Sequence, residues 1–293
     1  MIYETEEIKK LVQAGDLPQI TEDNYYSDEI AHHYMSFHRW LSFHGSLGVP
    51  GCEAKAVAEL NGEYQEEISD AFLIGGYIDA KLAGTEAELE RYRQAHPEMF
   101  VTRGERKGEL QAKYLICDKM IERCERDELF MAFLSGEHQA IFVAMLFGVP
   151  WCCKLDSYVP GKLISDLKST REMHRQFYVP DFGHVDFISY YSYTHQLAIY
   201  RELVKAVTGD TLPCFVNAVS KSNHPEIKVI HIDDVSLYDA ITEVKNSCEA
   251  GSLPDVWRGL IQPIRCNRPD CEYCIDTEVL KDPINYKELI MGD

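Results

Sequence analysis

Residues 151–170 read WCCKLDSYVPGKLISDLKST and place one acid, Asp156, ten residues before the acid-x-base triplet Asp166-Leu167-Lys168. In an extended strand alternate side chains share a face, so Asp166 and Lys168 project together while Leu167 turns toward the opposite packed layer. The proline-glycine turn in the middle of this stretch would fold the strand that carries Asp156 back beside them. Two carboxylates and one ammonium then converge, and metal-assisted hydrolysis of a phosphodiester requires such a group.

The composition indicates a globular protein. The chain has 293 residues, of which 45% are hydrophobic, so it can bury a sizeable core without disulfides. It contains no apolar run of about eighteen residues, and its acidic beginning, MIYETEEIKKLVQAGDLPQ, lacks the apolar centre of a signal peptide. We therefore expect a soluble, cytoplasmic protein with no membrane partner. Its 10 cysteines favour free thiols or metal ligands over a disulfide framework.

The net charge of −19 argues against a nucleic-acid partner, because affinity for DNA depends largely on phosphates neutralised by lysine and arginine. Net charge reports the long-range field, however, whereas a binding groove needs only a local cluster of basic side chains. Each such side chain taken singly is equally well explained as a solvated surface charge. The candidates for a basic groove are Arg103, Arg106, Lys107, Arg171, Arg175 and Lys221.

The order of predicted elements is that of an α/β fold. Helical patterns lead into three strand candidates that form a meander on short turns, and a helix, two further strands and a last helix follow. The helical stretches cover 53–67, 69–94, about 110–133, 189–209 and 235–251, and the strands cover 136–148, 151–159, 162–170, 213–222 and 227–233. We expect a single domain over 1–293, with an amino-terminal helical extension at 1–50, a core at 51–250 and a cysteine-containing tail at 251–293.

An aromatic-rich amphipathic stretch, AHHYMSFHRWLSFHG, occupies residues 31–45. A metal site made from its histidines is conceivable, but a helix that packs its aromatic side chains inward and leaves the histidines in solvent is favoured. The histidines concerned are His32, His33, His38 and His44.

Asp156, the triplet at 166–168 and a downstream Gln196-xxx-Tyr200 together resemble the PD-(D/E)xK nucleases of the RecB-like branch. More narrowly, the segments FLIGGYIDAKLAGT, FGVPWCCKLDSY, LISDLKST and HQLAIY resemble the phage-type exonucleases akin to lambda exonuclease and the RecE nuclease domain. The resemblance runs from about Ser36 to Cys274. It implies a restriction-endonuclease-like core, in which helices flank a central mixed sheet. An acid-x-lysine triplet alone would be weak evidence, whereas the ordered set is strong.

The resemblance implies that Asp156 and Asp166 hold Mg²⁺ or Mn²⁺, with the backbone carbonyl of Leu167 as a further ligand. Lys168 would orient or help to deprotonate the attacking water and offset charge on the phosphate. The competing interpretation is an ordinary surface ion pair between Asp166 and Lys168.

The resemblance implies further site residues, and each of them also has a purely structural interpretation. Gln196 and Tyr200 are four residues apart on one helix face, so both could reach the same phosphate or ligand water. The alternative is that Tyr200 packs in the core and Gln196 faces solvent. Asp79 stands where the family usually has a histidine; it is either a metal ligand through oxygen or an exposed helical acid. Glu137 is a further candidate ligand, although a salt-bridged role is favoured.

The tail contains Cys266, Cys271 and Cys274 in a CxxxxCxxC spacing within a polar tract, so a soft-metal site is physically reasonable. Some RecB-like nucleases hold an iron-sulfur cluster with one cysteine before the core and three after it, and Cys52 has the corresponding place. The order of the two gaps is reversed here, so an iron-sulfur cluster, zinc and no metal all stay open. The cysteines expected to pack in the core are Cys117, Cys124, Cys152, Cys153, Cys214 and Cys248.

By resemblance, the chain is a Mg²⁺-dependent exodeoxyribonuclease. It would degrade one strand of duplex DNA from an end for recombination, through in-line attack of a metal-activated water. A homo-oligomer and a single-strand annealing protein are the expected partners. The alternatives are an iron-sulfur-bearing nuclease acting on single-stranded ends and a catalytically silent DNA-binding subunit. The sequence contains no Walker loop, dinucleotide fingerprint, nucleophile elbow or zinc-protease helix, which disfavours ATP hydrolysis, nicotinamide redox chemistry and serine hydrolysis.

Overall fold

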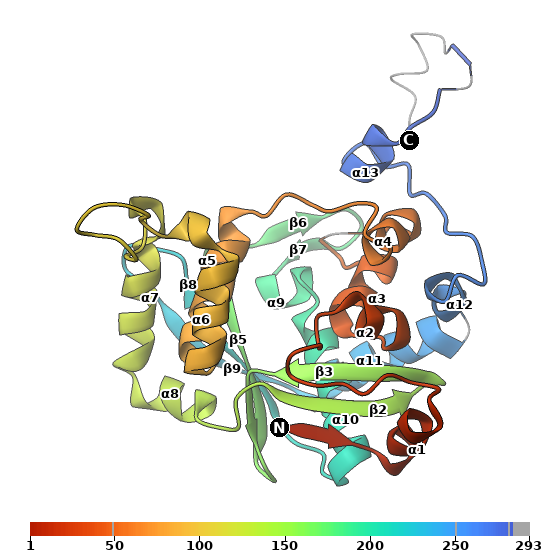
Figure 1. Ribbon diagram of the computed structural model, residues 1–293, viewed down its shortest axis with the longest axis horizontal. Coiled ribbons are helices and arrows are strands. Elements are labelled where there is room, and N and C mark those ends of the chain that lie inside the picture. Colours follow the sequence, from red (N-terminus) through yellow and green to blue (C-terminus); the bar gives the residue numbers. More distant parts are fainter. Residues whose placement is uncertain (49, 250, 281, 284–293) are drawn as a thin grey trace.

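Two β-sheets that meet at one bent strand form the centre of the computed structural model, which describes residues 1–48, 50–249, 251–280 and 282–283 (Figure 1). The first sheet has the order β1-β2-β3 and the second the order β4-β5-β8-β9, while β6 and β7 form a separate hairpin. The strands are β1 (Ile2–Glu4), β2 (Ala140–Leu146), β3 (Val149–Leu155), β4 (Ser157–Val159), β5 (Leu163–Thr170), β6 (Phe177–Val179), β7 (Gly183–Val185), β8 (Cys214–Ser220) and β9 (Ile227–Ile232).

Helices cover both sheets. They are α1 (Glu6–Ala14), α2 (Asp28–His33), α3 (Phe37–His44), α4 (Glu53–Leu60), α5 (Asp70–Leu82), α6 (Glu86–Ala95), α7 (Ile116–Glu125), α8 (Glu128–Leu134), α9 (Phe187–Tyr190), α10 (Tyr193–Thr208), α11 (Asp234–Glu249), α12 (Leu253–Trp257) and α13 (Glu272–Asp276). Two short 3₁₀ helices, η1 (Pro97–Met99) and η2 (Ala112–Tyr114), complete the set. Within the described part of the chain, no helix is both long and apolar enough to cross a membrane.

The bend at Asp156 joins the two sheets. Leu155 pairs with Ala140 of β2, whereas Ser157 pairs with Ser165 of β5, so the chain changes sheets at the single residue between them. The β4–β5 pairing is antiparallel and closes through the expected proline-glycine turn, where Gly161 has a φ of 68°. Left-handed backbone of this kind favours glycine. The predicted return of the chain beside Asp156 is therefore confirmed.

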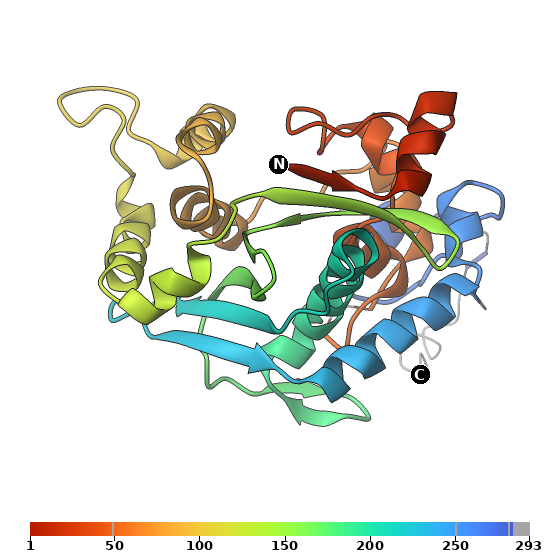
Figure 2. The same ribbon diagram turned by 90° about the horizontal axis from the view of Figure 1, so that it is seen from below.

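The second sheet is mixed, as expected for an α/β fold. β5 and β8 are parallel, and β8 and β9 are antiparallel. A parallel pair needs a long connection, which α10 provides by crossing one face of the sheet (Figure 2). The largest core cluster lies on this face, whereas Leu167 belongs to the cluster under α5, α7 and α8. The predicted alternation along β5 is thus confirmed.

Several expected elements differ from the structure. The amino-terminal segment is not purely helical, because β1 pairs in parallel with β2 and extends the first sheet. The helix expected over 53–67 ends at Leu60, and that expected over 110–133 is split into η2, α7 and α8. The predicted meander is two hairpins rather than one sheet, because the strand expected over 151–159 bends in its middle. Composition favoured these helices, but turns and tertiary pairing interrupt them.

The histidine-rich stretch folds as α2 and α3, with Phe37, Trp40 and Phe43 buried as expected. His32 and His33 are exposed. The six cysteines expected in the core are buried and free.

The paired glycines of α5 let this helix approach its neighbours closely. A Cβ on Gly75 would lie 3.1 Å from the Ser169 hydroxyl of β5, and one on Gly76 would lie 2.7 Å from the ring of Tyr92. The Tyr92 hydroxyl donates a hydrogen bond to the Leu73 carbonyl at 2.8 Å, so that ring cannot move freely. Gly75 thus allows α5 to lie against β5, and Gly76 allows it to lie against α6.

We expect Gly76→Ala to lower the free energy of unfolding by about 1 kcal/mol, because overpacking against Tyr92 costs more than the helix propensity that alanine gains. Urea denaturation measures this change. Gly75→Ala is the matched control and should be neutral or stabilising, since the Ser169 hydroxyl can rotate away. Equal stability of the two variants would contradict the role assigned to Gly76.

Candidate active site

Three carboxylates and the Lys168 ammonium line a single cavity of about 940 Å³ together with other basic side chains. Asp156 comes from the bend between the sheets, Asp166 and Lys168 from β5, and Asp79 from α5. The structure therefore brings together the predicted acids and the predicted base. It also places Gln196 and Tyr200 of α10 on the same cavity.

Asp156 is held by the backbone of β5. Its Oδ2 accepts a hydrogen bond from the Leu167 N–H at 2.7 Å. Burial raises the pKa of Asp156 well above its ordinary value, and repulsion from Asp79 and Asp166 raises it further. The N–H and C=O of a strand residue point to the same edge, so the Leu167 carbonyl also faces this open edge, where the resemblance places a metal ligand.

Asp166 connects β5 to α10. The Asp166 carboxylate is 2% exposed; one oxygen forms an ion pair with the Lys168 ammonium, and the other accepts a hydrogen bond from the Gln196 amide at 3.3 Å. The same amide donates to the Tyr200 hydroxyl at 2.7 Å. Burial opposes the charge of Lys168, but Asp166, Asp156 and the nearby Tyr193 together raise its pKa. Gln196 is thus buried in the site rather than facing solvent.

Asp79 points into the same cavity from the helix opposite. Burial raises the pKa of Asp79 to about 6; the Asp166 charge adds to this, whereas Lys168 and Lys154 oppose it. Its buried Oδ1 has no hydrogen-bond partner among the described residues. Asp79 is therefore not an exposed helical acid.

Glu137 lies elsewhere. It precedes β2 instead of lying within a strand, and its backbone forms an isolated bridge with Tyr158. Its carboxylate accepts a hydrogen bond from the Tyr3 hydroxyl at 2.6 Å. Tyr3 holds this carboxylate, and Glu137 is not among the residues that line the cavity.

Only half of the residues predicted for the basic groove line the cavity. Arg171, Arg175 and Lys221 line the cavity beside the acids. The other three candidates, Arg103, Arg106 and Lys107, lie in the exposed segment between Phe100 and Leu110 and do not line it.

Sequence analysis missed Lys154. Its ammonium lies 3.4 Å from the Glu88 carboxylate, its side chain is 12% exposed, and it lines the cavity beside Asp79. Lys154 stands two residues before Asp156 on the same strand, so the alternation that paired Asp166 with Lys168 could have found it.

The four predicted cysteine ligands also meet. Cys52 precedes α4, and the other three come from the tail. All four sulfurs lie within 4.8 Å of one another, and Cys274 Sγ is 3.7 Å from both Cys52 Sγ and Cys266 Sγ. Burial opposes ionisation of Cys274, but hydrogen bonds from the Asn267 backbone and the neighbouring thiols lower its pKa to about 7.

Comparisons with known proteins agree with this geometry. Residues 36–277 match the family described as a PDDEXK-like domain of unknown function (DUF3799). The chain belongs to this PDDEXK-like family. It is also similar to the crystal structure of a "putative exonuclease" from Eubacterium rectale, with 36% identity and a TM-score of 0.85 over 94% of this chain and 99% of that one. No curated protein matches the chain.

Membership of the PDDEXK-like family confirms the predicted superfamily and supports a nuclease. The narrower resemblance to phage-type exonucleases stays a prediction. Nucleases of this superfamily typically use divalent metals, and the cavity fits one: three carboxylates face it, and the unpartnered Asp79 Oδ1 supplies a hard oxygen donor. Aspartate in place of the usual histidine is compatible with Mg²⁺.

Because burial makes the Asp79 charge costly, Asp79→Asn should raise the free energy of unfolding in EDTA at pH 8, by about 1–2 kcal/mol. The pKa of Asp79 rises from 3.8 to about 6 on folding, so the cost of its charge is full above pH 6 and absent below 3.8. The gain should therefore shrink as the pH falls through this window. Urea denaturation across pH tests this.

The matched control is Asp70→Asn on the same helix. The Asp70 carboxylate is exposed and accepts hydrogen bonds from Lys113 at 2.8 Å and from Tyr114 at 2.6 Å, and the Lys113 bond above all lowers its pKa. Its replacement should destabilise the protein at pH 8. A loss of stability in both variants would mean that Asp79 makes stabilising contacts.

Proposed function

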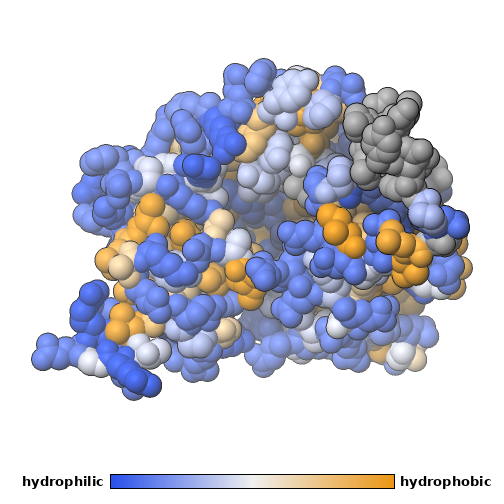
Figure 3. Space-filling view, turned by 90° about the horizontal axis from the view of Figure 1, so that it is seen from above, coloured by the Kyte–Doolittle hydropathy of each residue, from blue (hydrophilic) through white to orange (hydrophobic). Residues whose placement is uncertain are grey.

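We propose that the protein is a Mg²⁺-dependent exodeoxyribonuclease that degrades one strand of duplex DNA from an end. The observation that carries this proposal is the convergence of Asp156, Asp166 and Lys168 in one cavity that also has Lys154, Arg171, Arg175 and Lys221 on its wall. An acidic protein can therefore still offer phosphates a local basic surface. Hydrophilic side chains cover most of the face shown in Figure 3, and its apolar patches are separate.

Asp79, Asp156, Asp166 and the Leu167 carbonyl would hold the divalent ion. When bound, the ion acts as a Lewis acid that favours ionised water and offsets phosphate charge. Lys168 keeps its proton, because the carboxylates around it raise its pKa. Its role is therefore to orient water through hydrogen bonds and to stabilise negative charge on the phosphate, and not to accept a proton.

Gln196 and Tyr200 position the acid of β5. The Gln196 amide donates to both Asp166 and Tyr200, so it fixes the carboxylate orientation from α10. The proposed recombination role, the homo-oligomer and the annealing partner rest on the family resemblance alone.

Purified protein with Mg²⁺ or Mn²⁺ should degrade linear duplex DNA and spare closed circles. Asp166→Ala and Lys168→Ala should each lower the rate at least 100-fold, because the first removes a ligand of the ion and the second removes the ammonium that stabilises charge on the phosphate. Gel analysis of end-labelled DNA measures both effects.

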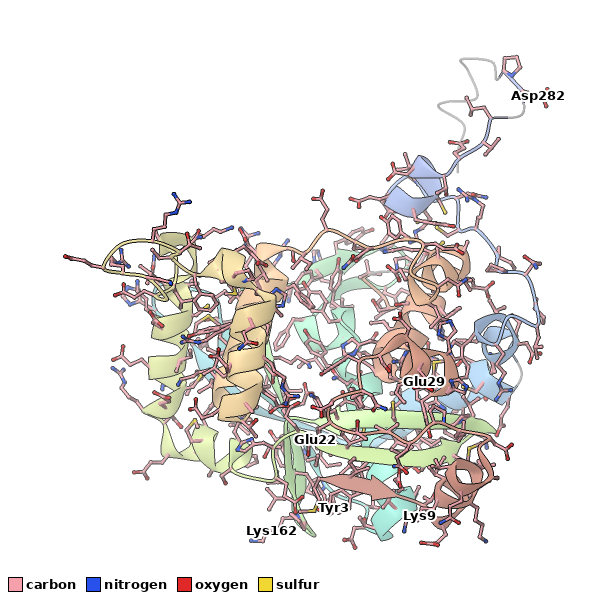
Figure 4. The ribbon with its side chains drawn as sticks, in the orientation of Figure 1. Tyr3, Lys9, Glu22, Glu29, Lys162 and Asp282 are labelled. Carbon is pink, nitrogen blue, oxygen red and sulfur yellow. The ribbon has the colours of Figure 1, made fainter. Side chains whose placement is uncertain are left out.

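Lys162→Ala is the matched control. Lys162 lies in the turn before β5, away from the cavity, and should leave the rate unchanged (Figure 4). Equal residual cleavage by the parent, Asp166→Ala and Lys168→Ala proteins would indicate a contaminating nuclease and would contradict the proposed activity.

We also propose that the four cysteines bind a soft metal. A tetrahedral ion with metal–sulfur bonds of about 2.3 Å holds its sulfurs about 3.8 Å apart, close to the observed 3.7 Å. In a four-iron cluster each thiolate binds a different iron, so the sulfurs lie farther apart. The observed spacing therefore favours one ion such as Zn²⁺. Its role would be structural, since it joins the tail to the start of α4.

Metal analysis should find one zinc per chain, and Cys271→Ser should lose the zinc and lower the melting temperature by several degrees. Cys248→Ala, at a buried thiol outside the group, should keep the metal. If freshly purified protein contains iron and absorbs visible light, the site holds an iron-sulfur cluster and not zinc. If the protein contains no metal, the proposed site is refuted.

A further inference from the structure

The cleft continues beyond the acidic residues. A second cavity of about 840 Å³ shares Asp79, Lys154 and Tyr200 with the first, so the carboxylates lie partway along one continuous cleft. Two large aromatic side chains, Tyr26 and Phe72, also line both cavities. A polymer that extends along this cleft would therefore lie against these two rings.

Tyr26 and Phe72 are unusually accessible. Tyr26 is 77% exposed in the loop before α2, and Phe72 is 62% exposed on the first turn of α5. Single exposed aromatics are ordinary, but these two come from distant segments and face the same cleft. The Lys154 ammonium lies 4.7 Å from the centroid of the Tyr26 ring, a cation–π contact that holds it beside Asp79. Aromatic rings presented in this way are stacking platforms for nucleobases.

The charges of the cleft differ between its two ends. In the first cavity, Arg171, Arg175 and Lys221 form no ion pair with any carboxylate of the described residues. In the second cavity, Arg91 pairs with Asp23 at 3.0 Å, and Glu22 and Glu88 line the same space as the other arginine, Arg39. Phosphates are therefore attracted more strongly to the first end.

The second end is bridged by the loop before α2. Asp23 of this loop contacts Arg91 of α6, and both residues line the cavity. The neighbouring Glu22, labelled in Figure 4, lines the same cavity. A strand bound by its phosphates at the first end would meet this ion pair and its acidic neighbour at the second.

We propose that DNA enters this cleft as an unpaired strand end whose bases stack on Tyr26 and Phe72. In a duplex both faces of each internal base are covered by neighbouring bases, only the terminal pair has one free face, and the Watson–Crick edges are paired. An unpaired strand can offer a free base face to each of the two rings while its phosphate reaches Asp166, which is 2% exposed. The inference rests on the proposed nuclease function and specifies its substrate: a duplex must open at its end before cleavage.

The test uses a single-stranded oligonucleotide with Mg²⁺. Tyr26→Ala and Phe72→Ala should each raise KM about 5- to 150-fold, the loss expected for one stacked base, and change kcat much less. Tyr26→Phe keeps the ring and should retain the parental KM. Tyr178→Ala is the matched control, because Tyr178 is 68% exposed on β6 and lines neither cavity. Melting temperatures establish that each variant is folded.

Substrate changes provide the second arm. Replacing the base that stacks by an abasic site should reduce affinity in the parent protein and cause little further loss in the alanine variants. Duplex DNA whose strands are cross-linked at the ends should resist cleavage, whereas unmodified duplex is degraded. Unchanged KM in both alanine variants, or equal cleavage of cross-linked ends, would overturn the inference.

The two proposals fail differently. If the parent protein shows no cleavage beyond that of Asp166→Ala, the nuclease proposal fails. Fluorescence anisotropy with a labelled single-stranded oligonucleotide in Ca²⁺ then still tests stacking, through weaker binding by Tyr26→Ala and Phe72→Ala than by Tyr178→Ala. Cleavage with normal affinity in those variants would leave the nuclease proposal intact and remove only the stacking role.

Discussion

Three carboxylates and the Lys168 ammonium lie together in one cavity, and the rest of the site depends on this cluster. Burial is the largest cause of the raised pKa values of Asp79 and Asp156, and repulsion from neighbouring carboxylates adds to it. Apolar side chains of similar size at these positions would avoid the energetic cost of burying charge. The fold instead holds them with backbone and amide hydrogen bonds, which is the expected compromise between stability and a cation-binding function.

The bend at Asp156 makes this cluster possible. A straight strand would pair with β5 along its whole length and would cover the edge that carries the Leu167 N–H. Because the chain changes sheets after Leu155, this edge stays open and the Asp156 carboxylate binds it. On the other side of the cavity, Gly75 allows α5, which carries Asp79, to lie close to β5.

The amino-terminal segment lines part of the cleft and is not only an extension of the core. β1 completes the first sheet, and the loop before α2 supplies Tyr26 and an acidic wall at one end. At the other end of the chain, the cysteine group attaches the tail to α4. The amino-terminal segment therefore shapes the cleft, whereas the cysteine group lines neither cavity.

The sequence by itself determined the features that depend on local periodicity. Alternation along β5 predicted that Asp166 and Lys168 share a face, the glycine turn predicted the return of Asp156, and helical spacing predicted that Gln196 and Tyr200 lie together. Backbone geometry fixes each of these within one element or one hairpin. The spacing of the tail cysteines likewise indicated a group that needed a fourth ligand.

Only the tertiary structure decided which distant residues meet. No local pattern predicts the pairing of β1 or the bend at Asp156. The same holds for the presence of Arg171 and Arg175, rather than Arg103, on the cleft wall, and for the meeting of Tyr26 and Phe72 at one cleft. Each depends on how helices and sheets pack across many intervening residues, where burial and shape outweigh the intrinsic preference of a short segment.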